Sequence, residues 1–248
     1  MPELAQARAQ SEQRLTQVLT SLGSEWRARI EPYLGYPPDV SRVPPGLWAD
    51  MEFAYRQKLS REAAAIYLLA LGRMSDETPE GYTVAEPLAA QFATQWTEKR
   101  AAITAQQFVT NTRERLVTLR RDLVIPKPGT TLPPAGDGGA ALLDDLLGNA
   151  FGESRATTMA VTETTATISG GEAGFRKAYL DYSGHLLLAI WTTEEDDRVC
   201  PVCSPLHEKP QTEWPVEILM LGTLGPPAHP NCRCWLEYKL VTKEQMGV

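Results

Sequence analysis

Apolar side chains recur every three or four positions along the first half of the chain, which is the spacing of an amphipathic helix. Three stretches show this pattern: residues 3–30, 48–69 and 83–123. A proline-rich segment at 31–46 separates the first two, and we expect the chain to bend there. Ser60 is a suitable helix N-cap and Gly72 a suitable stop. The second pattern is therefore expected to start afresh at Ser60 and to end near Gly72.

The pattern changes along the second half of the chain. Residues 141–155 and 171–184 have helical spacing, and the second of these is expected to end at Gly184. Between them, six threonines at positions 157–167 weaken a helix, although we still favour one there. Two apolar stretches, 185–194 and 234–241, have the length and composition of strands. The sequence thus predicts an α+β fold, with a mostly helical N-terminal region before a small module of helices and antiparallel sheet.

Proline, glycine and small polar residues dominate positions 124–140, a composition that neither continues a helix nor builds a core. We therefore predict a helical region at 1–124, a linker at 125–139 and a second module at 140–248. The two regions are expected to behave as separable units, and a contact with another protein is expected in residues 1–124.

Charge and hydropathy exclude some classes of protein. The 248 residues carry a net charge of −7, which argues against coating nucleic acid through bulk charge. No apolar run is long enough to span a membrane, and the polar N-terminus is no secretory signal, so synthesis in a reducing cytoplasm is expected. One local stretch is basic and contains only three acidic residues. Its bases are Lys99, Arg100, Arg113, Arg115, Arg120, Arg121 and Lys127. This stretch is either a solvated helix face or a contact for phosphate or an acidic partner.

All four cysteines of the chain lie in one stretch near its C-terminal end. Cys200 and Cys203 form C-x-x-C, and Cys232 and Cys234 form C-x-C with His229 three residues earlier. Two such pairs can complete a tetrahedral zinc shell, and zinc can order the long proline-rich loop between them. Cys200 and Cys203 are expected to be two of the four ligands. The other two are any two of His229, Cys232 and Cys234. Disulfides, free thiols and a Cys–His nucleophile are the alternatives.

Signatures of enzymes are absent from the sequence. His207 and Glu208 begin like H-E-x-x-H, but Gln211 replaces the second histidine and Pro210 would break the helix. The chain has no Walker loop, dinucleotide fingerprint or G-x-S-x-G, and we assign no catalytic residue. The acidic pair Asp196 and Asp197 is typical of a solvated turn.

The order and spacing of the cysteine stretch resemble a known family. "DDRVCPVCSPLHEK" followed by "PPAHPNCRCWL" is similar to the C-terminal module of tailed-phage head morphogenesis proteins of the phage Mu F type, also called minor head or minor capsid proteins. The resemblance covers residues 140–241 and departs from the usual glycine at Glu208. The matching residues are Thr162, Glu163, Trp191, Asp197, Val199, Cys200, Cys203, Pro226, Pro227, His229, Pro230, Cys232, Arg233 and Cys234.

The resemblance implies a structural and assembly protein of the phage head rather than an enzyme. Such a protein is made in the bacterial cytoplasm, associates with the portal or the major capsid protein, and ends in the virion. Packaged DNA is a further expected partner, through the basic stretch at 99–127, and no membrane is expected. Two other classes remain open: a helical DNA-binding factor, and a zinc-dependent nuclease or hydrolase in which His207, His229 and Asn231 meet an acidic residue around a metal.

Overall fold

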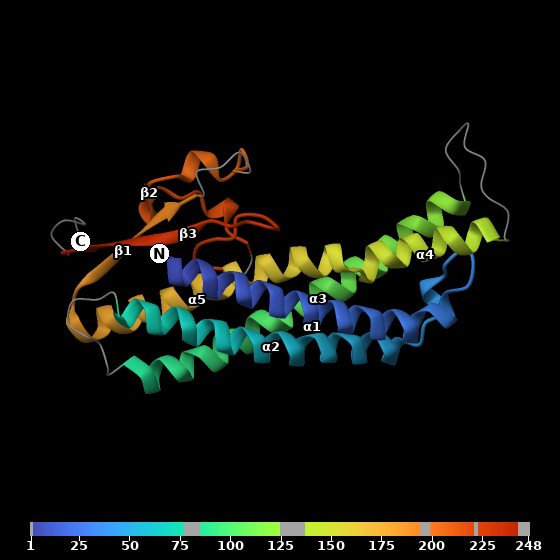
Figure 1. The fold of residues 1–248 in the computed structure, drawn as a ribbon, viewed down its shortest axis with the longest axis horizontal. Coiled ribbons are helices and arrows are strands. Elements are labelled where there is room, and N and C mark those ends of the chain that lie inside the picture. The colour runs from blue at the N-terminus through green and yellow to red at the C-terminus, as the bar shows by residue number, and fades with distance from the viewer. Residues whose placement is uncertain (1, 77–84, 125–136, 194–198, 221–222, 243–248) are drawn as a thin grey trace. The chain divides into compact units, whose positions relative to one another are not determined.

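The computed structural model describes residues 2–76, 85–124, 137–193, 199–220 and 223–242 (Figure 1). Within these residues the α-helices are α1 (Pro2–Leu34), α2 (Pro45–Asp76), α3 (Ala85–Val124), α4 (Asp137–Phe151) and α5 (Glu153–Ser183). The strands are β1 (Leu186–Thr192), β2 (Lys209–Pro210) and β3 (Trp235–Val241). Single 3-10 turns are η1 (Val40–Arg42), η2 (Ser204–Leu206), η3 (Gln211–Glu213) and η4 (Val216–Ile218). The predicted α+β class is confirmed.

The first two helices are longer than their patterns predicted. α1 continues past residue 30 because Ile30 and Leu34 are fully buried, and it ends at Gly35, whose φ of 64° favours glycine. α2 neither restarts at Ser60 nor stops at Gly72. A glycine inside a helix costs about 1 kcal/mol, and burial of apolar side chains on both sides of Gly72, such as Leu71 and Met74, outweighs this cost.

α5 unites three predicted segments in one helix. Its threonines are compatible with the helix because they are buried, and Thr162 donates a hydrogen bond to the carbonyl of Thr158 at 2.6 Å. Gly170 and Gly171, where the segment at 171–184 was expected to begin, allow other helices to approach closely. A Cβ at Gly171 would lie 2.8 Å from the carbonyl oxygen of Tyr67, and one at Gly170 would lie 2.4 Å from the Trp96 ring. α5 ends at Gly184, as predicted.

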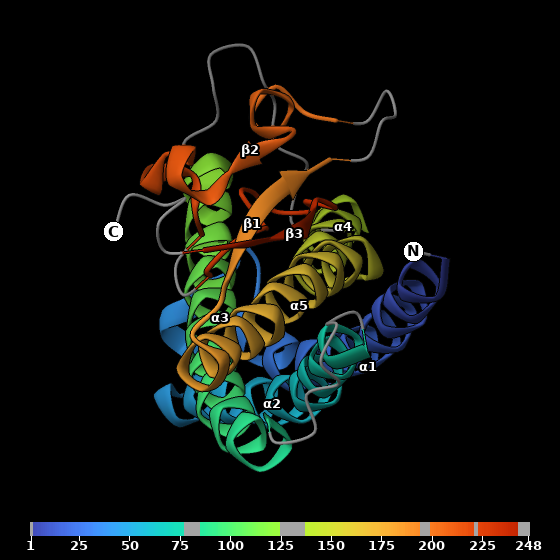
Figure 2. The same cartoon turned by 90° about the vertical axis from the view of Figure 1, so that its left-hand side faces the viewer.

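The sheet is antiparallel and has the order β2-β1-β3. Both predicted strands are present, with β1 paired to β3 along its whole length, from Leu186 opposite Val241 to Thr192 opposite Trp235. β2 was not predicted, because a strand of two residues leaves no alternating pattern. The central strand β1 lies between β2 and β3 (Figure 2). Its residue Leu187 shares a core cluster with Tyr67 of α2 and Phe175 of α5.

The structure divides into two compact units. One contains residues 1–12, 60–100 and 158–248, and the other contains residues 13–59 and 101–157. Each unit therefore takes segments from both sides of the predicted linker, so residues 1–124 by themselves do not correspond to either unit. In this division α1, α2, α3 and α5 each contribute residues to both units. Residues 125–136 of the predicted linker lie outside the described residues, and 137–139 belong to α4.

None of the described helices combines the length and the hydropathy needed to cross a membrane.

Candidate metal centre

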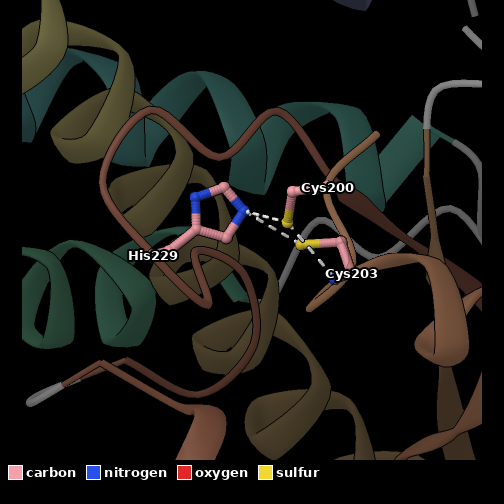
Figure 3. A group of neighbouring side chains, drawn as sticks. All are labelled: Cys200, Cys203 and His229. Atoms are coloured by element: carbon pink, nitrogen blue, oxygen red, sulfur yellow. Dashed lines mark hydrogen bonds between the residues drawn. The ribbon is translucent and has the colours of Figure 1, made fainter. Parts of the chain in front are cut away.

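Cys200, Cys203 and His229 point toward one another from two separate turns (Figure 3). The Nε2 atom of His229 lies 3.0 Å from Sγ of Cys200 and 3.2 Å from Sγ of Cys203. A second group of thiols shares one member with the first. Cys203, Cys232 and Cys234 have their sulfurs within 4.8 Å of one another. Five nitrogen and sulfur donors therefore converge around Cys203 and could hold a metal ion such as zinc.

The two groups are connected through the sulfur atoms of Cys203 and Cys232, which lie 3.8 Å apart. Two thiolates bonded to one tetrahedral zinc at about 2.3 Å would be about 3.8 Å apart. Cys203, Cys232 and Cys234 are buried, Cys200 is half-buried, and all four are free thiols. The spacing, the donor types and the burial all fit a closed structural site.

A tight turn positions the first pair of cysteines. The backbone amide of Ser204 donates to the carbonyl oxygen of Cys200 at 3.0 Å, and the amide of Cys203 donates to the same oxygen at 3.1 Å. The Cys203 amide also lies 3.4 Å from Sγ of Cys200. These contacts hold the two cysteines of the C-x-x-C motif in one compact turn.

A second turn positions His229 and Cys232. The amide of Cys232 donates to the carbonyl oxygen of His229 at 3.2 Å, and Asn231 adopts a φ of 64°, which asparagine tolerates better than most residues. The amide of Asn231 then donates to Oγ1 of Thr162 at 2.9 Å. Thr165, one turn further along α5, donates to the carbonyl oxygen of Cys232 at 2.9 Å. The turn is thus fixed to α5 at two points.

The imidazole of His229 has a defined orientation. Its Nδ1 atom lies 2.8 Å from the carbonyl oxygen of Pro230, a group that can only accept a hydrogen bond, so Nδ1 carries the proton. In a neutral imidazole Nε2 is then the nitrogen with a free lone pair, and this atom faces the sulfurs of Cys200 and Cys203. Histidines that bind metals are commonly oriented in this way, by a hydrogen bond from the nitrogen that does not bind the metal.

The buried thiols share protons unequally. Hydrogen bonds with Cys232 and Cys234, together with burial, raise the pKa of Cys203 well above its ordinary value. The hydrogen bond from Cys203 lowers the pKa of Cys232, and a second one from Cys234 adds to this effect. The two pKa values therefore shift in opposite directions, as expected when buried thiols share a hydrogen bond in which either sulfur can donate.

Aromatic residues form an apolar base beneath the thiols. Trp191 of β1 is fully buried, and its ring packs edge-on against Trp214 with the ring centroids 5.3 Å apart. Both belong to the core cluster that contains the three buried cysteines and Leu236. The expectation that Trp191 is a core residue is confirmed, and three of the five donors are themselves part of this apolar core.

In the part of the chain that the structure describes, the residues that a hydrolytic centre would require do not form one group. The Nδ1 atom of His207 accepts a hydrogen bond from the backbone amide of Thr193 at 3.2 Å. Among the described residues, the groups able to hold a metal contain neither His207 nor a carboxylate. Asn231 contributes its backbone to the turn. The acidic residues Asp196 and Asp197 lie outside the described residues.

The basic stretch is only partly available to a partner. Arg100 is buried and forms a two-pronged ion pair with Glu163, at 2.9 and 2.8 Å, so its side chain is not exposed to a partner. The arginines further along α3 are exposed, namely Arg113, Arg115, Arg120 and Arg121. Arg120 forms an ion pair with Asp39. Lys99 is exposed, and Lys127 lies outside the described residues.

Sequence reasoning missed Thr165, which fixes the second cysteine turn to α5. Thr162 was noted only through the family resemblance, without a structural role. The sole signal in the sequence was the density of threonines in a helix, and this cannot identify which of them faces a distant loop.

No family model, curated protein or solved structure matches the chain.

Proposed function

We propose that this chain is a minor head protein of a tailed phage, of the phage Mu F type, whose C-terminal module is held together by one zinc ion. The observation that carries this proposal is the convergence of the two cysteine motifs. C-x-x-C and H-x-x-C-x-C, separated in the sequence by a long proline-rich loop, bring five donors together around Cys203. Two other residues that carry the resemblance support the same region: Thr162 accepts a hydrogen bond from the Asn231 amide, and Trp191 shares a buried core cluster with three of the cysteines.

We assign the zinc ligands to Cys200, Cys203, His229 and Cys232. The first three form one group, and the 3.8 Å separation of the Cys203 and Cys232 sulfurs supports Cys232 as the fourth. The two distances to the His229 nitrogen, 3.0 and 3.2 Å, are a few tenths of an ångström shorter than the roughly 3.6 Å expected between nitrogen and sulfur on one zinc. Cys234 remains a buried neighbour of the site.

The ion's role is structural. Three cysteines and one histidine close the tetrahedral shell and leave no open position for water or substrate. Bound zinc can contribute on the order of 10 kcal/mol to folding, which suits a loop built largely of turns and 3-10 segments between β1 and β3. We therefore propose no hydrolase activity for the chain.

The proposed partners are the portal or the major capsid protein. The exposed arginines of α3, including Arg113 and Arg115, are the proposed contact for packaged DNA or for an acidic protein surface. A contact of this kind would weaken steeply as the salt concentration rises, because phosphate binding releases counterions.

Co-expression with the portal and major capsid proteins of the same phage tests the head assignment. The gene is expected beside the portal gene, and the full-length protein should sediment with procapsids in few copies per particle. A tagged chain that remains at the top of the gradient, while portal and capsid proteins assemble normally, would contradict the assignment.

A further inference from the structure

Arg8, near the beginning of α1, contacts the backbone of the C-x-C segment from 225 residues away in sequence. Its Nη1 atom donates to the carbonyl oxygen of Arg233 at 2.8 Å. Its Nη2 atom donates to Oγ1 of Thr165 at 2.8 Å and lies 3.5 Å from the carbonyl oxygen of Cys232. One guanidinium therefore connects α1, α5 and the segment that carries two of the five donors, all within the same compact unit.

The guanidinium is held in place on its other side as well. Its Nε atom donates to the carboxylate of Glu12, one helical turn further along α1, at 2.9 Å. The side chains of Arg8 and Glu12 are only 13% and 21% exposed. Because the rigid fork of an arginine is already oriented by this pair, little side-chain entropy is lost when it binds the carbonyl groups.

Thr165 connects the arginine to the metal centre. Its hydroxyl accepts a hydrogen bond from Arg8 and donates one to the carbonyl oxygen of Cys232 at 2.9 Å. The carbonyls on both sides of the Cys232–Arg233 peptide bond are thereby fixed, and the direction of this backbone determines where the Cys232 sulfur lies. Groups that orient ligands in this indirect way commonly alter metal affinity by about 10- to 100-fold.

The positive charge of Arg8 should also favour zinc binding. A zinc ion bound by three thiolates and one neutral imidazole carries a net charge of −1, and Arg8 places a positive charge beside the backbone of one ligand. Glu12 offsets part of this charge, so the attraction adds less than the hydrogen bonds that orient the backbone.

We propose that Arg8 is a positioning residue of the metal centre, so that zinc binding and the docking of the first turns of α1 are coupled. The inference rests on the zinc site proposed above. Coupling of this kind is reciprocal: if docked Arg8 strengthens zinc binding, bound zinc must stabilise the docked beginning of α1 to the same degree. Residues 1–12 would then report whether the C-terminal site is occupied.

The test uses the full-length protein with three single substitutions, Arg8→Gln, Arg8→Lys and Arg61→Gln. Arg61 is the matched control, because it is exposed on a helix of the same unit. Zinc affinity is measured by competition with a chromophoric chelator. We expect Arg8→Gln to weaken zinc binding about tenfold with unchanged stoichiometry, Arg8→Lys to have an intermediate effect, and Arg61→Gln to have none. The charge-transfer absorption of bound Co²⁺ should remain that of the wild type, because Arg8 is not itself a ligand.

A second measurement distinguishes positioning from general stabilisation. Zinc should slow hydrogen exchange of the amides at residues 5–12 in the wild type and in Arg61→Gln, and much less in Arg8→Gln. Equal zinc affinity in the wild type and Arg8→Gln, or equal zinc-dependent protection, would overturn the coupling while leaving the zinc site intact. If the wild type bound neither Zn²⁺ nor Co²⁺, the metal site itself would be overturned, and the coupling with it.

Discussion

Arg100 of α3 and Glu163 of α5 form a buried ion pair in which two guanidinium nitrogens donate to the two carboxylate oxygens, at 2.9 and 2.8 Å. The side chains are 4% and 9% exposed. Glu163 directly follows Thr162, which holds the amide of Asn231. The adjacent residues Thr162 and Glu163 therefore have different structural roles. Thr162 supports the second cysteine turn, and Glu163 neutralises a buried arginine.

Substitution of Glu163 by Gln should destabilise the protein strongly. The change leaves the Arg100 guanidinium buried without its counter-charge, and breaking a pair of this kind costs about 3 kcal/mol or more. Chemical denaturation measures the loss in the free energy of unfolding. Glu98→Gln is the matched control, because Glu98 is exposed on α3 and its substitution should change stability by less than about 0.5 kcal/mol. Equal stability of the two variants would show that the pair contributes little.

Substitution of Gly171 by Ala tests the close approach of α2 to α5. The new Cβ would lie 2.8 Å from the carbonyl oxygen of Tyr67 and 2.9 Å from Cβ of Ala70, so the helices must separate, at a cost of about 1–3 kcal/mol. Gly148 of α4 is the control, because a Cβ there meets nothing within 4 Å. Gly148→Ala should raise stability by about 0.5–1 kcal/mol. A gain in melting temperature for both variants would exclude tight packing at Gly171.

Substitution of Glu208 by Gly should stabilise the cysteine loop. Glu208 has a φ of 61°, a conformation that costs most side chains about 1 kcal/mol, while its backbone amide donates to the carbonyl oxygen of Trp191 at 2.8 Å. Glycine relieves the strain and keeps the hydrogen bond, so we expect stability to rise by up to about 1 kcal/mol. The same change at exposed Glu217, in η4, should lower stability by about 0.5–1 kcal/mol. Thermal unfolding of both variants checks the contrast, and a loss at both positions would mean that the positive φ carries no strain.

The sequence was informative wherever a local pattern determines the structure. Residues Leu15, Leu19 and Trp26 are buried on one face of α1, as their spacing predicted, and both predicted strands pair in one sheet. Gly184 ends α5 because it adopts a positive φ, a property that can be inferred from the residue type.

The sequence was misleading wherever contacts between distant segments determine the structure. A further helical segment was expected to begin at residue 171, but α5 runs through Gly170 and Gly171, where Trp96 and Tyr67 approach it closely. Arg100 resembled an exposed base, but Glu163, 63 positions away, neutralises it. The cysteine cluster could be found from its motifs, whereas its supports Arg8 and Thr165 could not, because nothing in their local sequence indicates a distant backbone partner.

Elemental analysis of the purified protein tests the zinc site most directly. We expect about one zinc per chain for the wild type and for Cys234→Ser, and a clear loss for Cys200→Ser, Cys203→Ser, His229→Ala and Cys232→Ser, since each of these removes one of four ligands. Loss of zinc in Cys234→Ser with full retention in Cys232→Ser would contradict the ligand assignment. Metal content below about a tenth of an equivalent in the wild type, with the cysteines paired as disulfides by mass spectrometry, would contradict the zinc site altogether.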